Sequence, residues 1–186
     1  MIDIEKYIGF YCDENDFKIS ISYEMPEGYE TANGMYDPTI NTLFINESSF
    51  CHMEEYEQLF YLFHELRHAF QYLNSDRLDS LINRSRFYAV MYDGVCYKLI
   101  GNDWTECKLE GSKKYFTEMC LGQPYEIDAN RYDYEKVKLI LGDSQELEEL
   151  RDFWMPKEKI LDSEYEALYN RIDNLVKQIA FSRTEL

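Results

Sequence analysis

Apolar residues recur at every third or fourth position between residues 52 and 73, which is the spacing of one face of an amphipathic helix. At about 100° of rotation per residue, they fall on one side of the helix. The pattern predicts a long helix that begins after Ser48-Ser49 or near His52 and ends before Asn74. The stripe consists of Leu59, Leu62, Phe63, Leu66, Phe70 and Leu73.

Alternating apolar and polar residues ahead of this helix predict short strands. The first is Phe17–Met25, and two more, Gly34–Tyr36 and Ile40–Asn46, are joined across Asp37-Pro38-Thr39. Proline at the second position of a turn fixes φ near its type I value. We expect the three strands to form a small antiparallel sheet packed on the long helix.

The chain beyond residue 77 is mostly helical in pattern. Residues 94–100 and 104–109 are typical of a hairpin that turns at Gly101-Asn102, and a short helix is expected near 112–121. Proline at position 124 suits the first turn of a helix and glycine at position 142 suits its end. A helix is therefore predicted over residues 124–141.

Further helices are expected at the C-terminal end. Asp143, with Glu146 three residues later, matches a capping box, and an apolar stripe at helical spacing runs from Pro156 to Phe181. The fold class predicted is α+β, a small antiparallel sheet packed on the long helix with further C-terminal helices. No repeat or linker marks a boundary, so we expect one domain over residues 1–186, with 78–121 as a candidate insertion and 143–186 as a helical extension.

The charge of the chain limits its partners. Among 186 residues, 36 are Asp or Glu and 19 are Lys or Arg, which gives a net charge of −17. Such a surface repels phosphate backbones and anionic lipid headgroups. We therefore expect neither nucleic acid nor a membrane as a partner. The oligomeric state is left open.

The cysteines and the hydropathy pattern indicate a location. The five cysteines are odd in number and form no C-x-x-C pair, which is typical of free thiols in a reducing compartment. The acidic N-terminal segment lacks a basic region followed by an apolar run, and no stretch approaches the ~18 apolar residues of a membrane span. We expect a soluble, cytoplasmic protein.

The strongest chemical signal is His64-Glu65-Leu66-Arg67-His68, an H-E-x-x-H sequence inside the predicted long helix. Residues four apart on a helix lie one above the other, so the imidazoles of His64 and His68 can reach one Zn²⁺ ion. The carboxylate of Glu65 would then lie where it can act as a general base on a water molecule. With His64 at zero on the helical wheel, the apolar stripe centres near roughly 200° and His68 lies near about 40°. The two histidines therefore face away from the stripe, which argues against an ordinary role in the core.

A third metal ligand is expected from the helix over residues 124–141. Glu126 and Asp128 both carry carboxylates, but they lie about 200° apart around the axis, so only one can face the metal. We favour Glu126 and keep Asp128 as the alternative, because Ala129 lies one turn after Glu126 and would let the two helices approach closely. Arg67 and Arg131 are candidates to brace carboxylates of neighbouring helices.

These two motifs together resemble the minimal zincin metallopeptidases of the ImmA/IrrE type, which occur in phage and mobile elements. In that family an H-E-x-x-H helix is completed by a Glu in a pattern resembling E-x-x-A-[ND]-x-[FY], which residues 126–132 match, although Asp133 follows where the family often has Ala. The resemblance implies that His64, His68 and Glu126 bind zinc and that Glu65 is the catalytic acid/base. It also implies an antiparallel sheet whose edge strand lines the substrate cleft, and Ile40–Asn46 stands in that place.

The sequence thus leads to the hypothesis of a zinc-dependent metallopeptidase that hydrolyses peptide bonds of a protein or peptide substrate. The alternative is a non-catalytic acidic protein on a zincin fold, a phage or mobile-element product that binds a basic partner. A purely structural zinc site is a weaker alternative, because three ligands are visible and closed structural sites use four, usually with Cys.

Overall fold

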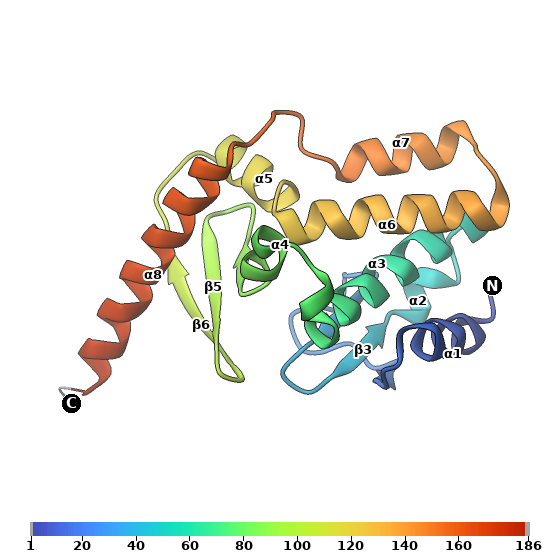
Figure 1. Ribbon diagram of the computed structural model, residues 1–186, viewed down its shortest axis with the longest axis horizontal. Coiled ribbons are helices and arrows are strands. Elements are labelled where there is room, and N and C mark those ends of the chain that lie inside the picture. Colours follow the sequence, from blue (N-terminus) through green and yellow to red (C-terminus); the bar gives the residue numbers. More distant parts are fainter. Residues whose placement is uncertain (1, 185–186) are drawn as a thin grey trace. The chain divides into compact units, whose positions relative to one another are not determined.

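The computed structural model describes residues 2–184 and shows an α+β protein (Figure 1). The chain forms two compact units, each with its own apolar core. The first contains the chain up to residue 79 together with 128–154, and the second contains 80–127 and the chain from 155 onward. Within the described residues, no helix is long and apolar enough to cross a membrane.

The sheet of the first unit is mixed, not antiparallel as predicted. Its strands are β1 (Ser20–Ser22), β2 (Gly34–Asp37) and β3 (Thr42–Ile45), in the order β1-β3-β2. β2 pairs antiparallel with β3, whereas β1 pairs parallel with it. After β1 the chain passes to the opposite edge before forming β2, so β3 takes the central position. The edge strand next to the long helix is therefore β2, and the strand expected over Ile40–Asn46 is central.

The helices of the first unit surround the long predicted helix, α3 (Glu55–Leu73). α3 begins later than expected, because the Glu57 carboxylate accepts a hydrogen bond from the Glu54 backbone and closes the N-terminus there. The preceding residues form the short helix α2 (Glu47–Phe50), capped by Asn46. The apolar stripe of α3 packs with α1 (Ile4–Asn15) in one core, which buries Leu43, Leu59, Leu62, Leu66, Val137 and Leu147.

The second unit contains an antiparallel sheet. Its strands are β4 (Tyr88–Val90), β5 (Val95–Ile100) and β6 (Asp103–Lys108), and the predicted hairpin turns at Gly101, whose φ is +62°. β4 was not predicted, because three residues are too few to show an alternating pattern. The helices of this unit are α4 (Ser80–Ser85), α5 (Lys113–Leu121) and α8 (Asp162–Thr184), and α8 packs on β5 and β6. The segment expected as an insertion thus forms a sheet with its own core.

The helix α6 (Pro124–Leu141) has the predicted bounds and ends at Gly142, whose φ is +91°. A 3-10 turn, η1 (Ser75–Arg77), follows α3 earlier in the chain. α7 (Gln145–Trp154) runs back beside α6 (Figure 1). The side-chain amide of Asn130 donates to the backbone carbonyl of Trp154. Asp143 does not cap α7 as predicted, because Ser144 accepts from the backbone of Leu147 and Asp143 pairs with Lys138.

The C-terminal helix α8 begins at residue 162 and not at 156. Backbone amides of Lys157 and Glu158 instead donate to the carboxylate of Glu118, which holds this segment out of a helix. Of the predicted C-terminal extension, residues 185 and 186 lie outside the described residues, as does residue 1 at the start of the predicted domain.

Candidate metal centre

The two histidines of the H-E-x-x-H sequence lie one turn apart on α3 with their rings close together. The ring centroids of His64 and His68 are 4.6 Å apart, and their Nε2 atoms are separated by 3.0 Å. His68 is 9% exposed, and the side chain of His64 is 16% exposed. As the helical wheel predicted, the rings lie off the apolar stripe, but they are covered by α6 and not by solvent, since Asp133 of α6 contacts His64.

Hydrogen bonds at the Nδ1 atoms determine which ring nitrogen of each histidine carries the proton. The Nδ1 atom of His64 lies 3.0 Å from a carboxylate oxygen of Asp133, and the Nδ1 atom of His68 lies 2.9 Å from Oε1 of Gln71. Carboxylate and amide oxygens only accept, so both Nδ1 atoms must donate. Each neutral ring then presents a lone pair on Nε2.

The two Nε2 atoms face each other across 3.0 Å, an arrangement that a metal ion bound to both nitrogens or a proton on one of them stabilises. Two nitrogens bound to one tetrahedral zinc at 2.0 to 2.1 Å are about 3.3 Å apart, close to the separation found here. A hydrogen bond to a carboxylate or carbonyl oxygen at the second nitrogen is also what metal-binding histidines usually make. The donor chemistry of the pair therefore fits a metal ion.

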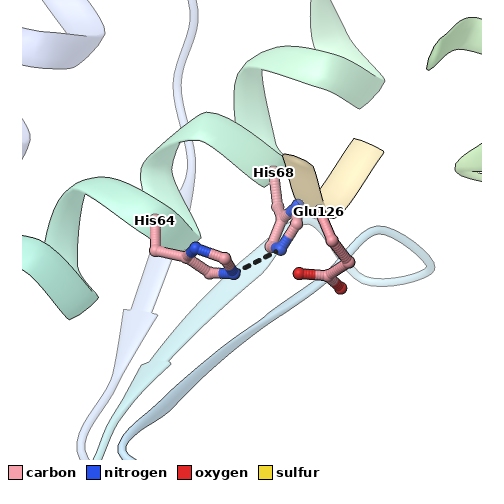
Figure 2. A group of neighbouring side chains, drawn as sticks. All are labelled: His64, His68 and Glu126. Carbon is pink, nitrogen blue, oxygen red and sulfur yellow. Dashed lines mark hydrogen bonds between the residues drawn. The ribbon is translucent and has the colours of Figure 1, made fainter. Parts of the chain in front are cut away.

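Glu126 completes a group of three potential ligands. One ligand atom each of His64, His68 and Glu126 lie within 4.8 Å of one another, and Figure 2 shows the carboxylate beside the two rings. The position of Glu126 follows from the continuity of α6, because residues 128 and 133 further along the same helix contact α3. Ala129, one turn after Glu126, is fully buried. Two imidazoles and a carboxylate are a donor set that suits zinc.

Asp128, the alternative third ligand, has a different partner. Its two carboxylate oxygens accept from Nε and Nη2 of Arg67 at 2.8 and 3.0 Å, which is a bidentate ion pair. It is not part of the three-residue group. The expected bracing by Arg67 is thus confirmed, whereas Arg131 is exposed.

Glu65 lies against the edge strand β2. Its Oε2 atom accepts a hydrogen bond of 2.8 Å from the backbone N–H of Tyr36. A Cβ atom built on Gly34 would lie 3.1 Å from Cγ of Glu65, so glycine at this position allows the carboxylate to approach the strand. One carboxylate oxygen of Glu65 is thus held by the backbone of the strand.

Asp133 is a buried acid that contacts His64. It is fully buried, and burial raises the pKa of Asp133 to about 6, while the hydrogen bond and charge of His64 oppose the shift. Its Oδ1 atom has no hydrogen-bond partner. A buried carboxylate with one oxygen on a histidine favours a cationic neighbour.

The sequence did not reveal Asp133 and Gln71 as partners of the histidines. A signal for Asp133 was available, since Glu126, Ala129 and Asp133 recur at spacings of three and four and so share one face of α6. Gln71 follows His68 by three residues, which places it on the same face of α3.

Comparison of the chain with protein-family models, with curated proteins and with solved structures finds no match.

Proposed function

We propose that this protein is a zinc-dependent metallopeptidase of the minimal zincin kind, which hydrolyses peptide bonds of a protein substrate. The observation that supports the proposal best is the convergence of Nε2 of His64, Nε2 of His68 and the carboxylate of Glu126. The similarity to ImmA/IrrE-type peptidases adds to it, because the same three positions match the zinc ligands of that pattern.

Bound zinc, Glu65 and the backbone N–H of Tyr36 would each have a different part in the reaction. Bound zinc supplies a Lewis acid, which polarises a carbonyl and lowers the pKa of a water molecule toward about 7. Glu65 would take a proton from the attacking water and return it to the leaving amine. The Tyr36 N–H holds Glu65 for both steps, since it binds one oxygen and leaves the other to exchange the proton.

The nature of the substrate follows from the sheet and the charge. β2 is an edge strand, and an extended peptide can pair with such an edge through its backbone. With a net charge of −17, the protein should prefer neutral or basic peptide segments and should not bind nucleic acid.

The five described cysteines are free thiols, which agrees with the proposed cytoplasmic location.

Metal analysis of protein purified without a histidine tag tests the proposal. Wild-type protein should carry about one equivalent of zinc, and a His64→Ala/His68→Ala double variant should lose it. His52→Ala is the matched control, because His52 is the remaining histidine and is exposed. Zinc that persists in the double variant would refute the site.

Catalysis is tested separately with a library of unstructured peptides analysed by mass spectrometry. Glu65→Gln should retain zinc and lose cleavage, because the amide cannot accept a proton. Bound zinc with no cleavage of any peptide or protein by the wild type, together with salt-sensitive binding to a basic protein, would favour the non-catalytic alternative.

A further inference from the structure

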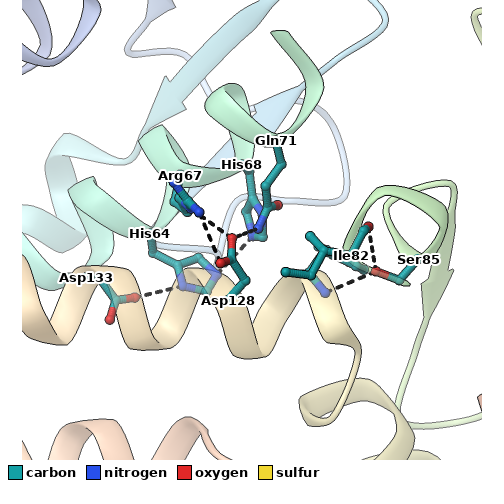
Figure 3. A network of polar contacts seen from close by, with 9 residues as sticks. His64, Arg67, His68, Gln71, Ile82, Ser85, Asp128 and Asp133 are labelled. Atoms are coloured by element: carbon teal, nitrogen blue, oxygen red, sulfur yellow. Dashed lines mark hydrogen bonds and ion pairs between the residues drawn. The ribbon is translucent and has the colours of Figure 1, made fainter. Parts of the chain in front are cut away.

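Arg67, Asp128 and Gln71 form a chain of hydrogen bonds that ends on the ring of His68 (Figure 3). Arg67 binds Asp128 through two hydrogen bonds, the Gln71 side chain donates to Oδ2 of Asp128 at 2.8 Å, and Oε1 of Gln71 lies 2.9 Å from Nδ1 of His68. We call these three residues the His68 relay. It lies between α3 and the part of α6 that belongs to the same compact unit.

The direction of every hydrogen bond in the relay is determined by its first residue. A guanidinium group can only donate, and an ionised carboxylate can only accept. Gln71 must therefore turn its NH₂ group toward Asp128, which directs its oxygen at His68. The His68 Nδ1 atom must then carry a hydrogen, so its Nε2 atom is left with the lone pair that a metal needs.

The relay is held rigidly. Gln71 is fully buried, and the side chains of Arg67 and Asp128 are 16% and 18% exposed. The Arg67 guanidinium also lies over the rings of Phe70 and Tyr132, with its Cζ atom 4.5 and 4.9 Å from their centroids. A buried amide that lost its partners would leave unsatisfied polar atoms, so alternative orientations of Gln71 are costly.

The two histidines are supported by different chemistry. His64 binds the carboxylate of Asp133 directly, whereas a neutral amide separates His68 from Asp128. The contact with Asp128 orients the Gln71 amide, and the amide separates the negative charge of Asp128 from the His68 ring. Glu126 and Asp133 already place two carboxylates beside the histidines, and a third in direct contact would add repulsion.

We propose that Arg67, Asp128 and Gln71 are positioning residues that hold His68 in the Nδ1–H tautomer, with Nε2 directed at the metal. The proposal rests on the zinc site described under Proposed function. Asp128, the alternative third ligand, is then two hydrogen bonds away from Nδ1 of His68, the ring nitrogen that does not face the metal. Loss of the relay should weaken metal binding without removing any ligand.

The test uses Gln71→Met in the full-length protein, because methionine has a similar volume and can neither donate nor accept strongly. Zinc affinity, measured by competition with a chromophoric chelator, should fall about 10- to 100-fold. The matched control is Gln58→Met. Gln58 lies on the same helix, is 3% exposed, and donates to the carbonyls of Phe50 and Met53. Its loss should lower the melting temperature comparably and change zinc affinity less than about twofold.

A second measurement reads the tautomer itself in chelator-treated protein. Long-range ¹H–¹⁵N spectra at about pH 8, where unperturbed imidazoles are neutral, should show His68 as Nδ1–H in the wild type and in Gln58→Met. Gln71→Met should show a substantial Nε2–H population. If Gln71→Met does not fold, Asp128→Asn and Asp128→Leu are compared in the same two measurements. The side-chain oxygen of Asp128→Asn can still accept from Arg67 and Gln71, so this variant should keep the tautomer and lose less zinc affinity than Asp128→Leu.

A folded Gln71→Met protein with wild-type zinc affinity and an unchanged His68 tautomer would overturn the proposal, as would Asp128→Leu with both properties intact. If the wild type binds no zinc, the proposed function fails, but the tautomer spectra still decide whether the relay orients His68. The two failures are therefore distinguishable.

Discussion

Gly34 of β2 lies directly against the side chain of Glu65, so replacing it with alanine tests the position of the proposed general base without touching a metal ligand. A Cβ atom there would lie 3.1 Å from Cγ of Glu65 and 3.2 Å from the carbonyl oxygen of Phe44. Phe44 belongs to the central strand β3 and is paired with Met35, so it cannot move without disturbing the sheet. The Glu65 side chain must therefore move.

The size of the displacement follows from these distances. Carbon atoms in good contact are about 3.5 to 4.0 Å apart, so Cγ of Glu65 should shift by about 0.5 Å. The hydrogen bond from the Tyr36 N–H, 2.8 Å in the structure, should lengthen to the limit of about 3.2 Å or beyond. Since a misplacement of about 1 Å can cost about 100-fold in rate, turnover should fall about 10- to 100-fold, or about 1.4 to 2.7 kcal/mol in the activation barrier.

Stability should change less than turnover. Overpacking should lower the free energy of unfolding by about 1 to 3 kcal/mol. The lower entropy of the unfolded chain with alanine should raise it by about 0.4 to 1 kcal/mol. Zinc affinity should stay within about twofold, because none of the three ligands contacts Gly34. Gly9→Ala is the matched control, since nothing lies within 4 Å of a Cβ built on Gly9 in α1.

Two assays check the result. Cleavage of a peptide from the library screen measures turnover, and the Tyr36 amide signal in ¹H–¹⁵N spectra reports the hydrogen bond to Glu65 even without a substrate. A folded Gly34→Ala protein with full turnover and an unshifted Tyr36 amide would show that Glu65 is not positioned by this strand. Loss of zinc together with turnover would point instead to general disruption of the site.

Four further substitutions have expected outcomes. Asp133→Asn should lower zinc affinity about 10- to 100-fold in a chelator competition, because a neutral amide accepts a weaker hydrogen bond from the His64 ring than a carboxylate does. Unchanged affinity would mean that Asp133 does not contribute to metal binding. Ala129→Leu should cost about 1 to 3 kcal/mol in urea unfolding and also weaken zinc binding, because the fully buried Ala129 leaves no space for a larger side chain; a variant as stable as the wild type would show that the helices can separate freely. Gly94→Ala should cost about 2 to 4 kcal/mol, since φ is +86° and a Cβ would lie 2.6 Å from a ring carbon of Phe116. Gly101→Ala, with φ of +62° and nothing within 4 Å, should cost only about 1 to 2 kcal/mol; equal losses in the two variants would show that backbone strain alone decides the effect.

The helices could be predicted from the sequence wherever apolar residues recur over several turns. α3 follows from its apolar stripe, α6 from the proline and glycine at its ends, and the hairpin of β5 and β6 from its turn at Gly101. The short strands could not be placed correctly, because the pairing of β1 with β3 depends on the path of residues 23–33. The N-terminus of α7 was wrong by one residue, since either Asp143 or Ser144 can cap a helix. In the structure Asp143 pairs with Lys138, and Ser144 accepts from the backbone of Leu147.

The sequence by itself determined that His64, Glu65 and His68 occupy one region of one helix, because a spacing of four residues is a local property of helical geometry. It also limited the candidates for a proposed third metal ligand to Glu126 and Asp128 on another helix. Only the tertiary structure placed Asp128 of α6 on Arg67 and Gln71 and brought Asp133 to His64, because each of those hydrogen bonds joins α6 to α3. The hydrogen bond between Gln71 and His68 lies within α3, and the contact with Asp128 decides which end of the Gln71 amide faces the ring. Helical spacing is set within the chain segment, whereas the protonated nitrogen of each ring is set by a partner that folding brings to it.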